Sequence, residues 1–144
     1  MNKKGVIAIV YDFDGTLSPR PMQEYTVLPE AGLTANQFWE EVKTENTRNE
    51  GEEIITYMML MLKKANEKSI KITKKDLGGL AGQIEFYKGV PSFFPRITEY
   101  VEDESRGKAQ LRHYIISSGL KEILRKLSIR KYFHNIFASR FVNL

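Results

Sequence analysis

The sequence contains no cysteine, and this absence excludes several kinds of chemistry. Without a thiol the chain forms no disulfide, has no cysteine nucleophile and holds no metal through sulfur. Histidine is scarce as well: His113 and His134 are its two occurrences, and neither has a second metal-ligating side chain at a useful spacing. We therefore expect both histidines to have structural roles.

A long uninterrupted apolar run is also missing. The most apolar stretch, residues 54–62, is broken by Thr56 and Tyr57 and is too short to cross a membrane. The apolar run near the start, residues 6–11, ends in Asp12 and lacks the length and the cleavage site of a signal peptide. We therefore expect a cytoplasmic protein with no membrane partner.

What is present is typical of a globular protein. The chain of 144 residues is 42% hydrophobic and 28% charged, which are ordinary values for a folded protein. Its length suits one domain, or a domain with a small appendage. No internal repeat or low-complexity segment interrupts it.

Acidic residues are almost missing from the last part of the chain. Residues 106–144 contain nine Lys or Arg and one acid, Glu122, whereas residues 1–105 contain 13 Lys or Arg and 17 Asp or Glu. A basic tail could bind nucleic acid, but these charges lie between apolar residues at helical spacing, without an aromatic platform. We favour a solvated helix over nucleic-acid binding. An alternative is that acidic partners of this region lie in sequence outside the chain.

An alternation of predicted strands and helices indicates the fold class. Residues 6–11 form a continuous, β-branched-rich run, which is typical of a strand covered on both faces in a parallel sheet. Residues 111–116 and 136–139 predict two further strands, and apolar spacing predicts helices over 91–101 and 120–127. We expect an α/β fold with a Rossmann-like parallel sheet of about three strands.

Three helical stretches interrupt this alternation. Residues 18–33, rich in proline, predict a crossing segment without an element of its own. Capping-box spacing at Thr34, a strongly apolar stretch over residues 52–67 and a second helix start at Thr73 then predict three helices. Three consecutive helices do not fit a compact crossover, so we predict an inserted helical cap. The predicted boundaries are residues 21–87 for this cap, and residues 1–20 with 88–144 for the α/β core.

Two carboxylates directly follow the first predicted strand. Asp12 and Asp14 are two residues apart at its carboxyl end, which is where ligands bind in open α/β sheets. A divalent cation would offset their mutual repulsion, and oxygen ligands suit Mg²⁺. The spacing also allows one carboxylate to attack phosphorus while the other protonates the leaving group. Gly15 permits a sharp turn, so that backbone N–H groups can approach phosphate oxygens.

A hydroxyl group is predicted at the end of the second strand. Ser117 ends this strand, and Ser118 and Gly119 are expected to lead into a helix. A hydroxyl with free N–H groups at a helix N-terminus is an anion site. If the two strands are neighbours, Ser117 and Asp12 face one crevice and hold one phosphate from two sides. Ser117 could also cap the helix, and the two roles are compatible.

The segment Asp-Phe-Asp-Gly-Thr-Leu at residues 12–17 resembles the first motif of the haloacid-dehalogenase-like (HAD) hydrolase superfamily. With typical residue frequencies, this pattern arises by chance in on the order of one chain of this length in several thousand. Ser117, before Ser118 and Gly119, resembles the second motif, and the predicted helices lie where the family places a small helical cap. The resemblance therefore covers nearly the whole chain.

The resemblance implies an Mg²⁺-dependent phosphohydrolase of the phosphatase branch. Asp12 would be the nucleophile that forms an aspartyl-phosphate, and also a metal ligand. Asp14 would be the general acid and then the base, and would bind the metal through its backbone carbonyl. An aspartate at position 14 is not expected in members that displace halide from carbon, so a small phosphomonoester is the expected substrate. A phosphomutase or a phosphonatase would share Asp12 and stays open.

The same resemblance assigns the remaining site residues. Backbone N–H groups and one hydroxyl would hold the phosphoryl oxygens, and the loop after the first strand would be braced by its own residues. The phosphate ligands would be the N–H groups of Phe13, Asp14 and Ser118 and the hydroxyl of Ser117, with Gly15 and Thr16 as loop support.

One part of the family's pattern is missing. The family also uses a lysine and further aspartates after the second motif, whereas 27 residues follow Ser117 and their sole acid is Glu122. We therefore expect an N-terminal portion of a longer protein, which alone would bind Mg²⁺ weakly and turn over poorly. The alternative is a non-catalytic module that binds phosphate, metal or another protein. A sheet of three strands would also expose an edge through which two copies could form a homodimer.

Overall fold

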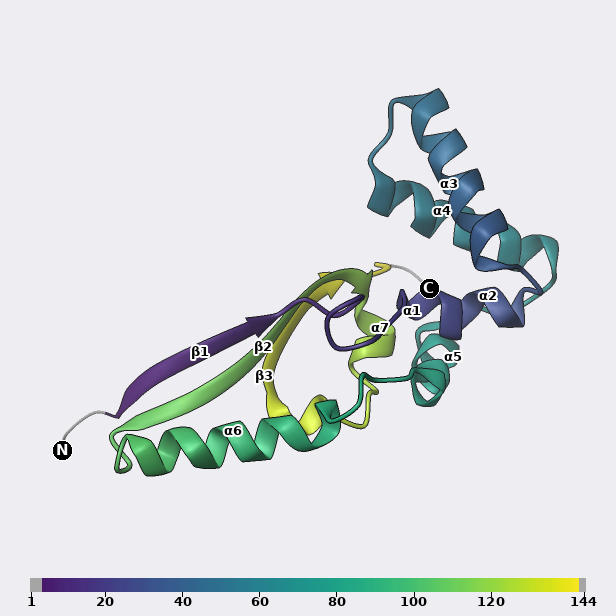
Figure 1. Cartoon of the computed structure of the whole chain (residues 1–144). Coiled ribbons are helices and arrows are strands. Elements are labelled where there is room, and N and C mark those ends of the chain that lie inside the picture. The colour runs from purple at the N-terminus through teal and green to yellow at the C-terminus, as the bar shows by residue number, and fades with distance from the viewer. Residues whose placement is uncertain (1–3, 143–144) are drawn as a thin grey trace.

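The computed structural model describes residues 4–142 and has a mixed α/β architecture (Figure 1). Three parallel strands form one sheet in the order β1–β2–β3, which confirms the predicted α/β fold with a three-stranded parallel core. Within this range no helix has the length and apolar character needed to span a membrane. The elements in chain order are β1 (Gly5–Tyr11), α1 (Met22–Tyr25), α2 (Val27–Glu30), α3 (Ala35–Asn49), α4 (Glu53–Glu67), α5 (Lys74–Gly79), η1 (Leu80–Gln83), α6 (Val90–Glu104), β2 (Ala109–Leu120), α7 (Lys121–Leu124), η2 (Arg130–Tyr132) and β3 (Phe133–Ser139).

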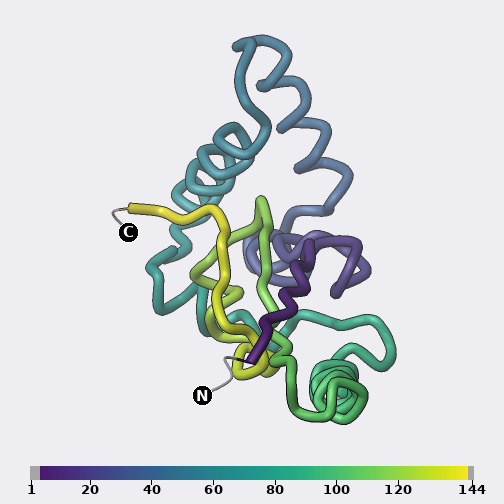
Figure 2. Tube along the Cα trace, turned by 90° about the vertical axis from the view of Figure 1, so that its left-hand side faces the viewer, coloured from purple at the N-terminus to yellow at the C-terminus, as the bar shows by residue number. Residues whose placement is uncertain are grey.

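β2 is the central strand of the sheet. It pairs with β1 from Gly5 opposite Ala109 to Tyr11 opposite Ile115, and with β3 on its other side. α6 lies along one face of the strands, and in the perpendicular view of Figure 2 it is seen end-on beside them. The three strands run in the same direction, so their carboxyl ends meet at one edge.

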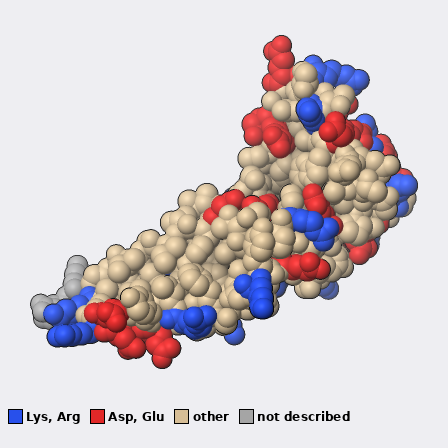
Figure 3. Space-filling view, viewed as in Figure 1, with Lys and Arg blue, Asp and Glu red and all other residues tan. Residues whose placement is uncertain are grey.

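β1 is not covered on both faces, contrary to the prediction. Val6 and Val10 are each 53% exposed, and Ile116 and Phe137 extend this apolar surface across β2 and β3. Figure 3 shows a long stretch over the sheet that carries no charged side chain. The reason is that β1 is an edge strand and α6 covers the opposite face. A continuous apolar run thus predicts a strand correctly without determining what covers it.

An aromatic cluster fixes α6 on the sheet. Phe94 is fully buried, and its ring centroid lies 4.9 Å from that of Phe133 and 5.6 Å from that of Tyr11. His113 completes the cluster: its two ring nitrogens hydrogen-bond the hydroxyls of Tyr11 at 2.9 Å and Thr98 at 3.0 Å. Burial lowers the pKa of His113, so the ring is neutral at physiological pH and serves the core.

α3 and α4 form an antiparallel pair, named here the helical hairpin, that projects away from the sheet (Figure 1). The predicted capping box starts α3: the Thr34 hydroxyl accepts from the Gln37 N–H, while the Gln37 side chain accepts from the Thr34 N–H. Glu52 caps α4 in a similar way through the Ile55 N–H. Local capping chemistry therefore locates both helix starts.

Two stretches differ from their predicted secondary structure, and one predicted helix is less buried than expected. The crossing segment over residues 18–33 contains two one-turn helices, α1 and α2, in which Met22 and Leu28 are buried. The helix predicted over residues 120–127 is the single turn of α7, because β2 continues as far as Leu120. On α6, Tyr100 is 60% exposed, so the contact surface of this helix is narrower than its apolar spacing suggests.

Candidate active site

A tight turn after β1 gives the two motif carboxylates different environments. Gly15 has φ +80°, in the left-handed region that favours glycine, and its N–H donates to the Ser18 carbonyl at 2.7 Å. Phe13 points into the core and is fully buried. Its two neighbours differ in exposure: Asp12 is exposed, whereas Asp14 is half-buried.

Asp14 is held by the chain that follows the turn. Its Oδ1 atom accepts a hydrogen bond of 2.9 Å from the Met22 N–H. Burial raises the pKa of Asp14 to about 6, the bond from Met22 offsets part of that rise, and the charges of Asp12 and Glu24 add to it. A carboxyl group with this pKa can both donate and accept a proton near neutral pH.

Ser117 lies on β2, just beyond the last residue of this strand that pairs with β1. The paired residues of β1 and β2 end with Tyr11 opposite Ile115, so the backbone at Asp12 and at Ser117 continues from the same edge. Ser117 is partly exposed, and its neighbour Ser118 is exposed. The fold thus places the two motifs on neighbouring strands, near the same edge of the sheet.

The backbone after Ser117 is a bulge in the strand and not the start of a helix. Ser117 pairs with Ala138 and Leu120 pairs with Ser139, which leaves the two residues between them out of register. The Gly119 N–H donates to the Ser117 Oγ at 3.0 Å. The helix N-terminus predicted as an anion site at Ser118 is therefore wrong, and the bulge itself shapes this side of the site.

Buried side chains that the sequence does not single out lie behind these residues. Met22 contacts both motifs, because its N–H binds Asp14 and its Sδ accepts from the Leu120 N–H at 3.1 Å. Tyr57, on α4, donates its hydroxyl to the Ser118 carbonyl at 2.7 Å. The one signal in the sequence is that Tyr57 interrupts an otherwise apolar stretch.

Gln23 and Tyr57 place polar atoms in the protein interior behind the two motifs. Gln23 is 2% exposed, and its Oε1 atom has no protein partner. Burial raises the pKa of the Tyr57 hydroxyl well above its usual range, and a hydrogen bond with the Gln23 side chain offsets part of that rise. Tyr57 therefore stays protonated and acts as a hydrogen-bond donor at physiological pH.

The side chains at this edge fit an Mg²⁺ ion in part. Asp12 could supply a carboxylate oxygen and Asp14 its backbone carbonyl oxygen, and both are ligands of the kind that Mg²⁺ prefers. Over residues 4–142, no three His, Asp or Glu side chains come together as a metal site. Mg²⁺ commonly binds through one or two carboxylates and completes its shell with water and substrate phosphate. The residues at this edge are therefore compatible with an Mg²⁺ ion that has few protein ligands.

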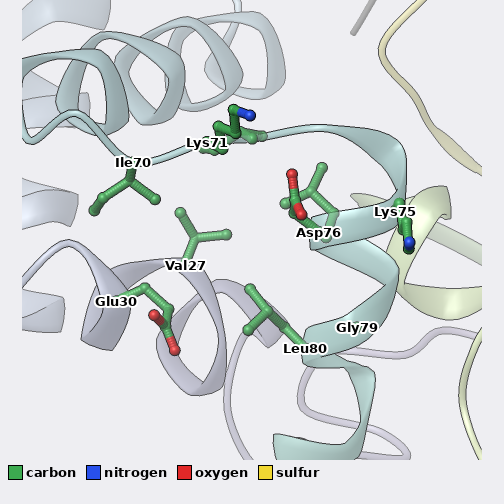
Figure 4. A pocket seen from close by; sticks show the side chains of 10 residues that line it. Val27, Glu30, Ile70, Lys71, Lys75, Asp76, Gly79 and Leu80 are labelled. Atoms are coloured by element: carbon green, nitrogen blue, oxygen red, sulfur yellow. The ribbon is translucent and has the colours of Figure 1, made fainter.

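A separate pocket lies between α2 and α5 (Figure 4). Val27, Ile70 and Leu80 form its apolar wall, and Glu30 and Lys71 lie beside them. None of the residues that line it belongs to the two motifs, so we do not place the active site there.

Comparison with known proteins gives one sequence relative and several structural ones. No protein-family model matches the chain. It is 26% identical over 148 residues to an uncharacterized protein of Borreliella burgdorferi, a match that covers 98% of this chain and 52% of the relative. The chain therefore spans about half the length of the curated relative that it matches.

Solved structures of HAD hydrolases share its architecture. A HAD family hydrolase from Salmonella enterica serovar Typhi superposes with a TM-score of 0.57 at 20% identity, over 94% of this chain and 40% of that one. A phosphoserine phosphatase, described as a phospho-aspartyl intermediate analogue, superposes with a TM-score of 0.59 at 18% identity, over 99% of this chain and 59% of that one. With a parallel sheet that carries the D-x-D-G-T-L turn at its carboxyl edge, the chain has the fold of the HAD-like hydrolases.

Proposed function

We propose that this chain forms the nucleophile-bearing part of a Mg²⁺-dependent phosphohydrolase that cleaves a small phosphomonoester. The observation that supports it most is the contrast between the two motif carboxylates at one strand end. Asp12 is exposed and accessible to a substrate, while Asp14 is partly buried with a pKa raised to about 6. A nucleophile and a general acid need different environments of this kind.

The first half-reaction forms a covalent intermediate on Asp12. A carboxylate oxygen of Asp12 attacks phosphorus, and the bond between phosphorus and the ester oxygen breaks. The departing alkoxide takes the proton of Asp14, so that the alcohol leaves neutral. The product on the protein is an aspartyl-phosphate.

The second half-reaction releases phosphate. The ionised Asp14 takes a proton from a water molecule, and the resulting hydroxide attacks phosphorus. The bond between phosphorus and the Asp12 oxygen breaks, which restores the Asp12 carboxylate and frees inorganic phosphate. Asp14 is then protonated and ready for the next substrate.

The phosphoryl oxygens need positive or donor groups around them. Mg²⁺ bound at Asp12 and Asp14 would offset the negative charge of the phosphoryl group. From the second strand, the Ser117 hydroxyl would donate to one phosphoryl oxygen, and backbone N–H groups at Phe13, Asp14 and Ser118 would contact others. Asp12, Gly15 and Thr16 are exposed, so a ligand can reach the turn from solvent.

Release of phosphate from a generic phosphomonoester tests the proposal. The protein encoded by the complete gene should release phosphate from this ester in the presence of Mg²⁺, and EDTA should stop the release. Asp12→Asn should abolish turnover, whereas Asp103→Asn, a matched change of an exposed carboxylate on α6, should leave it intact. Phosphate release that persists in Asp12→Asn would overturn the mechanism.

A non-catalytic phosphate-binding module is the second candidate. The observation that favours it is that, among residues 4–142, no three acidic or histidine side chains gather as a complete metal site. Such a module would bind inorganic phosphate through Ser117 and release none from an ester. Saturable phosphate binding without any Mg²⁺-dependent turnover would establish it and exclude the enzyme.

A further inference from the structure

The peptide group between Ser118 and Gly119 is held at both of its polar ends. Its carbonyl oxygen accepts the Tyr57 hydroxyl at 2.7 Å, and its N–H donates to the Ser117 Oγ at 3.0 Å. The peptide lies in the bulge between Ser117 and Leu120, where the ladder to β3 does not fix it. Its orientation therefore depends on these two hydrogen bonds.

The bond to Ser117 determines what the serine hydroxyl can still do. A hydroxyl group has one hydrogen to donate and two lone pairs that accept. Because the Gly119 N–H occupies a lone pair of Ser117, the hydroxyl hydrogen is directed elsewhere and is available to a phosphoryl oxygen. Hydrogen bonds in such a chain also polarise one another, so each strengthens the next.

Tyr57 brings the helical hairpin into this chain of bonds. It lies on α4, 61 residues before Ser118 in sequence, and it is 4% exposed. On its core side lie the buried Gln23 and the adjacent Met22, which binds both Asp14 and Leu120. A shift of the helical hairpin relative to the sheet would therefore move the Tyr57 hydroxyl relative to the bulge.

We propose that Tyr57 is a positioning residue for phosphate binding, which orients the Ser118–Gly119 peptide and, through it, the Ser117 hydroxyl. This inference rests on the proposed function, since it assigns Ser117 to a phosphoryl oxygen. It adds that the helical hairpin controls the phosphate site through one buried hydroxyl. Tyr57 acts without touching the substrate.

A double-mutant cycle with inorganic phosphate as the probe tests this coupling. Phosphate affinity is measured by calorimetry in the presence of Mg²⁺ for the wild type, Tyr57→Phe, Ser117→Ala and the double variant. Tyr57→Phe removes one hydroxyl and keeps the ring. Tyr132→Phe is the matched control, since its ring stacks on Phe94 in the aromatic cluster that fixes α6 on the sheet. Thermal unfolding and the amide resonance of Gly119 are recorded for each variant.

The expected result is a coupled loss of affinity. Tyr57→Phe should weaken phosphate binding about fivefold to tenfold, the effect of one lost hydrogen bond. In the Ser117→Ala background the same change should have no further effect, because the group through which it acts is gone. The Gly119 amide resonance should shift in Tyr57→Phe without phosphate, and Tyr132→Phe should change neither reading.

Three results would overturn the inference, and they distinguish its failure from that of the proposed function. Unchanged affinity in Tyr57→Phe, or losses in the two single variants that multiply in the double variant, would remove the role of Tyr57 and leave the proposed function standing. A wild-type protein that binds no phosphate at all would contradict the proposed function, and the inference would be lost with it.

Discussion

The burial of Asp14 should make the stability of the protein depend on pH. Its pKa is 3.8 in the unfolded reference and about 6 in the folded protein, mainly because burial disfavours the charged form. Between these values the folded state keeps a proton that the unfolded state has released. The free energy of unfolding should therefore fall as pH rises through this window, by about 1–3 kcal/mol from this group.

His113 changes the free energy of unfolding with pH in the opposite direction. The effect of Asp14 is therefore measured as the difference between the wild type and Asp14→Asn. The pKa of His113 is lowered by burial, so its contribution is lost as pH falls below 6.5. Subtracting the stability curve of Asp14→Asn from that of the wild type isolates Asp14, and Asp103→Asn serves as the control. Parallel curves for the wild type and Asp14→Asn between pH 4 and 6 would show that Asp14 is not buried as described.

Gly119 is required by the packing behind the bulge. A Cβ atom at this position would overlap the end of the Met22 side chain and lie 2.9 Å from its Sδ. Met22 is fully buried, so it cannot move aside freely. Gly119→Ala should destabilise the protein by about 1–3 kcal/mol in chemical denaturation. Gly79→Ala, where a Cβ atom meets nothing within 4 Å, should leave the stability unchanged. Equal denaturation midpoints for the two variants would contradict the close contact between Gly119 and Met22.

Single residues were predictable where the chemistry is local in sequence. Asp12, Asp14 and Gly15 stand together in one motif, and Ser117 follows a recognisable strand. Met22 and Tyr57 could not be predicted, since their contacts depend on how a proline-rich crossing segment and a helix fold back over the two strand ends. The residues next to Met22 and Tyr57 in the sequence give no indication that their segments fold back in this way.

At the scale of elements, the start of α3 should depend on its capping box. Thr34 and Gln37 satisfy each other's N–H groups. Thr34→Ala should lower the free energy of unfolding by about 1 kcal/mol, measured by urea denaturation. Thr44→Ala, an exposed change within the same helix, should have little effect or stabilise it slightly. A larger loss from Thr44→Ala than from Thr34→Ala would argue against the cap.

The elements show where periodicity predicts well and where it does not. Capping residues and apolar spacing located α3, α4 and α6 closely, because both signals arise within a helix. The end of β2 was harder to predict: Ser118 and Gly119 look like the entry to a helix, yet pairing with β3 extends the strand to Leu120. Pairing between distant strands overrides local preference there.

At the scale of the whole molecule, the uncovered sheet face should promote association. β1 is an unpaired edge without proline or charge among Gly5–Tyr11, and its apolar side chains continue onto the open face of the sheet. The chain alone should associate with rising concentration in sedimentation velocity. The double substitution Val6→Lys and Val10→Lys should suppress this association. Ile55→Lys, at a 60% exposed position on α4, should leave the association unchanged. A chain that stays monomeric, or that responds equally to Ile55→Lys, would contradict a role for β1.

Chemical trapping tests whether a carboxylate oxygen of Asp12 bonds to phosphorus during turnover, as the proposed mechanism requires. The protein is mixed with a phosphomonoester and Mg²⁺, quenched in acid and reduced with borohydride, which converts an aspartyl-phosphate to homoserine. Peptide mass spectrometry then locates the modified residue. We expect modification at position 12 that requires both substrate and Mg²⁺ and is absent from Asp12→Asn. Turnover with no trapped residue at position 12, or with the modification at another aspartate, would contradict it.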